Sequence, residues 1–158
     1  MGFTPSTSNS KNWGGQFPWL SIADMSQKYL NNTSKTITEY GASNKDVIKK
    51  GTLVMSFKLS IGKLGILNTD MYTNEAICNL KWKNNNDIST EVMYYYVNSI
   101  NILKYGSQAA KGITLNKQTL KTIPIKTPSM KEQEKIANFW MLIDEKISLL
   151  EKTYLLYV

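Results

Sequence analysis

The sequence contains no histidine and only one cysteine, and both shortages restrict its chemistry. Without histidine, the chain cannot form a Ser/His/Asp triad, a Cys/His pair or a histidine metal site. A single cysteine excludes an internal disulfide and fits a reducing, cytoplasmic compartment. Cys78 lies in a stretch of alternating apolar and polar residues. We therefore expect it to be an inert strand residue rather than a nucleophile.

The sequence also lacks the hallmarks of several protein classes. No stretch approaches the ~18 consecutive apolar residues of a membrane span, and residues 1–6 do not have the basic and apolar regions of a secretory signal. No Walker-type phosphate loop or dinucleotide fingerprint is present. No metal-ligand spacing relates the carboxylates Asp24, Asp46, Asp70, Glu75 and Asp87. We therefore expect no membrane association, no metal site, no cofactor and no catalysis by this chain.

The formal net charge is +7, and every basic residue is a lysine. The placement of this charge is more informative than its total, because no acidic residue lies between Glu91 and Glu132. The lysines of this acid-free stretch are Lys104, Lys111, Lys117, Lys121, Lys126 and Lys131. A block of one sign inside a foldable region indicates an anionic partner, most commonly DNA. On charge alone, a solvated lysine face explains the pattern equally well.

The apolar patterning predicts an α+β domain with a small mixed sheet. Strands are expected at 17–22 (beginning after Pro18), 52–57, 64–68, 76–82 and 120–125. Helical spacing extends over 90–104, where Ser89 or Thr90 can supply the N-cap, and a short helix is expected from Asn116. The segments 2–15 and 105–113 are rich in small and polar residues and read as loops.

The last thirty residues predict a long helix. Ser129 and Glu132 have the spacing of a capping box. Apolar residues then follow at alternating intervals of four and three, the pattern of a coiled-coil seam. The expected seam comprises Ile136, Trp140, Ile143, Ile147, Leu150 and Tyr154. We place a domain boundary between 1–128 and 129–158. The helix either packs on its own domain or pairs with a partner helix, and the regular seam favours the partner.

Four segments, in this order and spacing, carry a resemblance to a known family. They extend over residues 2–25, 51–63, 72–77 and 112–137, and include Thr4-Pro5-Ser6, Pro18-Trp19-Leu20 and Glu132-Gln133-Glu134. Together they resemble the target-recognition domain and following helix of the specificity subunits of Type I restriction-modification systems. The resemblance covers nearly the whole chain. Such a subunit usually has two recognition domains, so this chain resembles one half.

The resemblance implies a non-catalytic DNA-reading role. In the family, each recognition domain reads one half of a split site on double-stranded DNA, and paired helices act as a ruler that fixes the gap. The subunit holds an adenine-specific methyltransferase subunit on DNA and, through it, a restriction subunit. If this chain stands alone, we expect a homodimer formed through its C-terminal helix.

Polar residues at expected turns are candidates for DNA contact. We expect the lysines to contact mostly phosphates, and Asn74, Gln108 and Asn116 to be either base readers or structural turn and cap residues. The full candidate set is Lys58, Ser60, Lys63, Thr73, Asn74, Gln108, Lys111, Thr114, Asn116 and Lys117. Motif residues shared by a family cannot read a variable sequence, so the base readers are expected in stretches such as 27–45 or 83–87.

Two other functions remain open at this stage. The chain could be a protein–protein scaffold whose helix docks on a larger enzyme, without DNA specificity of its own. A self-contained nuclease or methyltransferase is the least favoured alternative, because the carboxylates show no metal-ligand spacing. Salt-sensitive DNA binding by the chain would distinguish a DNA reader from a scaffold.

Overall fold

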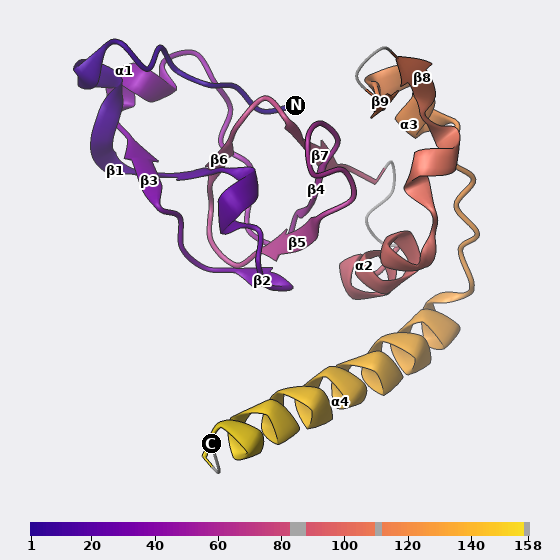
Figure 1. The fold of residues 1–158 in the computed structure, drawn as a ribbon. Helices are drawn as coiled ribbons and strands as arrows, with labels where there is room; N and C mark the ends of the chain where they lie inside the picture. Colours follow the sequence, from indigo (N-terminus) through magenta and orange to yellow (C-terminus); the bar gives the residue numbers. More distant parts are fainter. Residues whose placement is uncertain (83–87, 110–111, 157–158) are drawn as a thin grey trace.

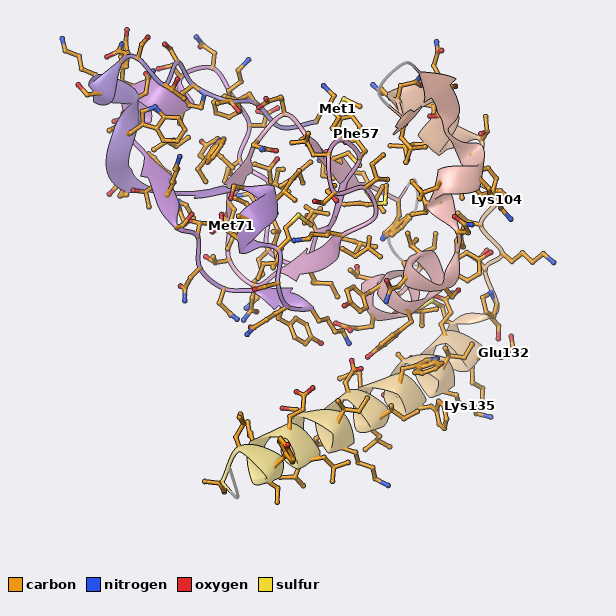
Figure 2. The ribbon with its side chains drawn as sticks, in the orientation of Figure 1. Met1, Phe57, Met71, Lys104, Glu132 and Lys135 are labelled. Carbon is orange, nitrogen blue, oxygen red and sulfur yellow. The ribbon has the colours of Figure 1, made fainter. Side chains whose placement is uncertain are left out.

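The computed structural model describes residues 1–82, 88–109 and 112–156 (Figure 1). Two small mixed β-sheets form the N-terminal part, and a hairpin, short helices and one long C-terminal helix follow. This arrangement confirms the predicted α+β class. Figure 2 shows Phe57 and Met71 within the packed sheet region, and Glu132 and Lys135 near the start of the long helix.

The first sheet is centred on β1 (Trp13–Leu20), which pairs antiparallel with β3 (Lys35–Ile37) and parallel with β6 (Tyr72–Thr73). The prediction that β1 begins after Pro18 was wrong, because the strand begins at Trp13. Gly14 has a positive φ of 77°, and a Cβ at Gly15 would clash with the backbone of Ile37 and Thr38. The glycines that suggested a loop instead permit an irregular, closely packed strand.

The second sheet has the strand order β2-β5-β4-β7. It contains β2 (Tyr29–Leu30), β4 (Leu53–Ser56), β5 (Leu64–Leu67) and β7 (Ile77–Leu80). The last three confirm strands predicted from their apolar runs. Both faces of β4 are covered. Leu53 and Met55 pack toward α2, whereas Val54 packs in a separate core cluster with residues such as Leu20 and Met71. This two-sided burial explains why β4 is apolar at consecutive positions.

Short helical segments connect these strands. They are η1 (Ser10–Asn12), η2 (Ile22–Asp24) and α1 (Glu39–Ala42). Asp24 accepts hydrogen bonds from the backbone and hydroxyl of Ser21 and from the backbone of Ser34. Burial alone would raise the pKa of Asp24, but these hydrogen bonds lower it below its ordinary value. Asp24 therefore remains ionised and fixes the turn between the two sheets.

The helix α2 (Thr90–Ser99) begins where it was predicted, with Ser89 as its N-cap. The Ser89 hydroxyl accepts from the backbone N–H of Val92 at 3.4 Å. The predicted extension to Lys104 was wrong, because Ile100 is in an extended conformation and a separate 3₁₀ helix, η3 (Ile102–Tyr105), follows. Val92, Met93 and Val97 are buried against the second sheet.

The segment after η3 contains a hairpin and a short helix. The strands β8 (Ser107–Ala109) and β9 (Gly112–Thr114) pair antiparallel, so the prediction of a loop at 105–113 was wrong. The helix α3 (Lys117–Lys121) begins after Asn116, as predicted. The predicted strand at 120–125 was wrong, because the Asn116 cap places Leu120 and Lys121 in α3 and residues 123–125 form no regular element.

The last element, α4 (Met130–Leu155), confirms the predicted long helix. Glu132 accepts from the backbone and hydroxyl of Ser129, which completes the capping box. The helix passes alongside α2 and then continues past it, below the sheets in this view (Figure 1). Only Gln133 and Ala137 are buried among its described residues. Within the described part of the chain, no helix is both long enough and apolar enough to cross a membrane.

Candidate nucleic-acid interface

A basic cleft of about 820 Å³ lies between the sheets and α3. Its walls include the loop before β4, the residues that follow β7, and α3 itself. The lysines lining this cleft are Lys45, Lys49, Lys81, Lys117 and Lys121, all of them exposed. Asp46 is the only acidic residue among the described lining residues. This cleft, hereafter the lysine cleft, therefore concentrates positive charge where an anion can enter.

Local structure fixes both walls of the lysine cleft. On one wall, Ile48 and Met71 exchange two backbone hydrogen bonds of 2.9 Å, which attach the loop carrying Lys45 and Lys49 to the sheets. On the other wall, the Asn116 side chain accepts from the backbone N–H groups of Gln118 and Thr119. The cap holds α3 with Lys117 and Lys121 along the cleft. These lysines thus project from backbone that is anchored.

One lysine of the cleft is partly neutralised. Lys49 pairs with Asp70 at 2.8 Å. The Lys49 ammonium, together with the backbone N–H of Lys50, lowers the pKa of Asp70 below its ordinary value. No described carboxylate lies within ion-pair distance of Lys45, Lys81, Lys117 or Lys121. These four ammonium groups carry the unbalanced charge of the cleft.

A second surface is the apolar side of α4. Exposed seam residues are Ile136, Trp140, Ile147, Leu150 and Tyr154, whereas Ile143 is half-buried. Leu142 and Leu149 are exposed beside this seam. Trp140 stacks on Tyr95 of α2, with ring centroids 5.7 Å apart. Apart from this attachment to α2, the apolar side of α4 is open to solvent and can accept a partner.

The comparisons with known proteins identify the family to which the chain belongs. The sequence model of the Type I restriction modification DNA specificity domain matches residues 1–155. The chain belongs to this family. This match confirms the resemblance drawn from the four sequence segments, and it assigns the specificity domain to DNA recognition in a Type I restriction-modification system.

Two curated relatives are specificity subunits. The specificity domain is 29% identical over 154 residues to the Type I restriction enzyme MjaIX specificity subunit of Methanocaldococcus jannaschii, covering 92% of this chain and 35% of the relative. It is 28% identical over 135 residues to the Type I restriction enzyme HindI specificity subunit of Haemophilus influenzae, covering 81% of this chain and 29% of the relative. The chain therefore spans about a third of the length of the curated relatives that it matches.

Solved structures show the same fold at low sequence identity. A chain from a study of complex assembly and conformational transition of the type I R-M system superposes with a TM-score of 0.76 at 16% identity, covering 97% of this chain and 37% of that chain. The HsdS subunit from Thermoanaerobacter tengcongensis superposes with a TM-score of 0.72 at 17% identity, covering 97% of this chain and 36% of that chain. The likeness covers the sheet region together with α4.

The predicted DNA-contacting residues of the specificity domain do not all lie at the lysine cleft. Lys117 lines the lysine cleft, as do four lysines missing from the predicted set: Lys45, Lys49, Lys81 and Lys121. Only Lys121 carried a usable signal, because it belongs to the acid-free stretch. Lys45 falls in the stretch 27–45 in which base readers were expected. The other such stretch, 83–87, lies outside the described residues, and Trp82 just before it lines the cleft.

Thr73 is a correction to the predicted set. Its side chain is 1% exposed, and the backbone N–H of Phe3 donates to its carbonyl at 2.8 Å. Gly2 covers it so closely that a Cβ at Gly2 would clash with the Thr73 hydroxyl. Thr73 therefore supports the floor of the cleft and cannot contact DNA, because the N-terminal segment lies over it.

The two described asparagines of the predicted set have structural roles. The Asn74 side chain accepts from the backbone N–H of Ala76 at 2.9 Å, and Asn116 caps α3. These are the turn and cap roles that the sequence offered as an alternative to base reading. Contact of either side chain with DNA stays a prediction.

The remaining predicted residues lie outside the lysine cleft or outside the description. Lys58, Ser60 and Lys63 are exposed in the turn between β4 and β5 and do not line the cleft. Gln108 and Thr114 are on the β8–β9 hairpin, but their side chains, like Lys111, lie outside the described residues. Roles in DNA contact for these six residues stay predictions.

The described part of the specificity domain contains no cluster of metal-binding side chains. There, no three carboxylates, thiols or imidazoles gather closely enough to hold a metal ion. Cys78 is buried in β7, and burial raises the pKa of its thiol to about 11. The predicted position of Cys78 in a strand is confirmed, and the raised pKa agrees with the expectation that its thiol is unreactive.

Proposed function

We propose that this specificity domain reads one half of a split DNA target and that its lysine cleft contacts the phosphate backbone. The main support is that five exposed lysines from three separate segments line one cleft, in which Asp46 is the single acidic residue among the described lining residues. Lysine neutralises phosphates and releases counterions, whereas base edges are read by neighbouring donors and acceptors. Base readers are expected on segments that border the cleft.

The seam of α4 supports a second part of the proposal. Two copies of the chain pair through this seam and form a homodimer with two recognition domains, so that residues 1–128 read DNA and 129–158 act as the spacer. Two-fold symmetry would then match a split site with symmetric halves. The assembled reader positions an adenine-specific methyltransferase subunit and, through it, a restriction subunit. The reader itself is a non-catalytic, cytoplasmic component that needs no cofactor.

Salt-dependent DNA binding tests this proposal. The chain and a double variant, Lys81→Gln with Lys121→Gln, are titrated with a fluorescent random-sequence duplex over a series of salt concentrations. The two lysines come from separate walls of the cleft. Each lost phosphate contact reduces the slope of log affinity against log salt by about 0.9, so the double variant is expected to lower the slope by about 1.8.

A matched control changes the same net charge elsewhere. Lys146→Gln with Lys152→Gln removes two lysines from α4, far along the chain from the cleft, and the slope should remain that of the unmodified chain. Equal slopes for the two double variants would mean that the lysine cleft does not contact the DNA phosphates. No salt-dependent binding by the unmodified chain would favour the alternative of a scaffold that docks on a larger enzyme through α4.

A further inference from the structure

Lys28 connects three parts of the molecule that are far apart in the sequence. Its ammonium lies 2.7 Å from a carboxylate oxygen of Glu91 on α2 and 3.6 Å from a carboxylate oxygen of Asp144 on α4. It also lies 2.6 Å from the hydroxyl of Tyr95. The Lys28 carbonyl accepts from the backbone N–H of Ile66 in β5, so this lysine is anchored on the second sheet. One cation therefore joins a sheet, α2 and α4.

The Lys28 contacts form a polar network of two carboxylates and two hydroxyls rather than a single ion pair. The Tyr95 hydroxyl donates to Asp144 at 2.6 Å, and the Tyr29 hydroxyl donates to Glu91 at 2.9 Å. Burial, followed by the Asp144 carboxylate, raises the pKa of Tyr95. The phenol therefore remains a hydrogen-bond donor at physiological pH. The network has no titrating hydroxyl that would loosen it under ordinary conditions.

Among the described residues, the network is one of two places where α4 is held by hydrogen bonds to the rest of the chain. At the start of the helix, Gln133 is 0% exposed; its amide accepts from the backbone N–H of Ser89 and donates to the carbonyl of Pro128. Asp144 lies eleven residues later, about 16 Å along the axis. Ala137 and Trp140 pack against the domain between these two points, and Asp144 adds an attachment farther along α4 that constrains the direction of the helix.

The burial of Lys28 distinguishes this network from an ordinary surface ion pair. Its side chain is 12% exposed, whereas the side chain of Lys49 in the Lys49–Asp70 pair is 72% exposed. An exposed pair of this kind contributes little, because water competes for both charges. A shielded cation held by two carboxylates and a hydroxyl is costly to leave unpaired. The fold retains it at the joint between the sheets and α4.

We propose that Lys28 is a positioning residue: it fixes the direction of α4 relative to the sheets and thereby sets the gap between the two half sites. This inference rests on the proposed function. A tilt of about 10° about Gln133 would move Leu155, about 33 Å along the helix, by about 6 Å, close to two base pairs of DNA. Small changes at the joint thus become steps of whole base pairs at the partner domain.

The direction of α4 is measured first without DNA. Spin labels are placed by Thr7→Cys and Ser148→Cys, both exposed positions, in the full chain with the buried Cys78 retained. Excess unlabelled chain suppresses distances between copies. Pulsed electron spin resonance should give one narrow distance distribution, and Lys28→Met and Asp144→Asn should each broaden it by several ångströms, because the attachment of α4 at Asp144 is weakened. Asp144 is 46% exposed, so its change to Asn spares the fold.

Two further variants make the measurement specific. Lys28→Arg retains the cation and should recover the narrow distribution, and Lys146→Met removes an exposed lysine two residues beyond Asp144 and should leave it unchanged. A distribution as narrow in folded Lys28→Met and Asp144→Asn as in the unmodified chain would overturn the proposal. This result is independent of DNA, so it does not depend on whether the lysine cleft binds duplex.

The gap itself is measured next. A half site is selected from a random duplex library, and pairs of it are separated in steps of one base pair. The unmodified chain should prefer one gap, and Lys28→Met should spread its affinity over neighbouring gaps while its affinity for a single half site stays the same. A broadened distance distribution with an unchanged gap preference would show that the direction of α4 at Lys28 does not determine the gap between the half sites, and would overturn that part of the proposal. Failure of the unmodified chain to select any half site would instead refute the proposed function.

Discussion

Leu53 in β4 and Leu149 in α4 have identical side chains, yet the first is 0% exposed and the second is 64% exposed. The same contrast holds between Ile77 in the second sheet, at 0%, and Ile147 in α4, at 49%. In the sheet region, apolar residues from several strands and α2 cover one another. In α4, many apolar residues are exposed, and beyond the contacts with α2 no described element covers them.

This difference distinguishes apolar residues that stabilise the fold from apolar residues that are available for contact with another chain. The sheets require Leu53 and Ile77 for their own stability. Gln133, a polar residue, is the most buried position of α4, whereas its leucines face solvent. A helix that holds its own domain through Gln133 and Asp144, yet leaves its apolar side exposed, is suited to pairing with another helix.

The largest effect is expected when the exposed side of α4 is given charge. Ile143→Asp with Ile147→Asp should convert the proposed homodimer to a soluble monomer, because two carboxylates would have to be buried in an apolar seam. Light-scattering mass measures the outcome. Asn138→Asp with Ser148→Asp adds the same charge to α4 outside the seam and should remain dimeric. A double seam variant that still runs as a dimer would refute the seam assignment.

A smaller effect is expected from matched truncations in the two regions. In the monomeric seam variant, Leu53→Ala should lower the free energy of unfolding by about 2–5 kcal/mol, because it leaves a cavity in the sheet core. Leu149→Ala in the same background should change it by no more than about 0.5 kcal/mol, as expected for an exposed position. Urea titrations followed by tryptophan fluorescence measure both. Similar losses for the two variants would mean that α4 is covered in solution by its own chain.

Elements with a local signal were predictable from the sequence. The strands β4, β5 and β7 follow continuous or alternating apolar runs, and the starts of α2 and α4 follow Ser89 and Ser129 caps. The start of β1 was missed because Gly14 and Gly15 usually mark loops, and here they allow the strand to approach β3. The strand proposed at 120–125 failed because a helix cap at Asn116 outweighed the apolar spacing.

The lysine cleft was only partly predictable because it is assembled from distant segments. Lys117 and Lys121 belong to the acid-free stretch, which the sequence displays directly. Lys45 and Lys81 join them only through the packing of the sheets, and neither has a distinguishing neighbour in the sequence. Thr73 was misplaced for a different reason: its polar neighbours indicated a loop, whereas it lies buried in the short strand β6.

The smallest expected effect is a pH-dependent loss of structure in the first turn of α4. Hydrogen bonds from the hydroxyl and backbone of Ser129 lower the pKa of Glu132 below its ordinary value of 4.5. A carboxyl with a lowered pKa in the folded state stabilises that state above its ordinary pKa, and this contribution is lost as the pH falls through the lowered value. Below about pH 4, the first turn of α4 should therefore fray while the sheets remain folded.

Amide hydrogen exchange resolves these two regions separately. The amides of the first turn of α4 should lose protection as the pH falls from 6 to 3, after correction for intrinsic rates, whereas those of β4 and β5 should not. Glu132→Gln should show weaker protection at pH 6 and little further change on acidification, because it has no carboxylate to protonate. Glu145→Gln, with the same charge change farther along α4, should behave as the unmodified chain. Parallel losses in β4 and α4 would show that the two regions unfold together, so that α4 is integrated with the sheets rather than held at a joint.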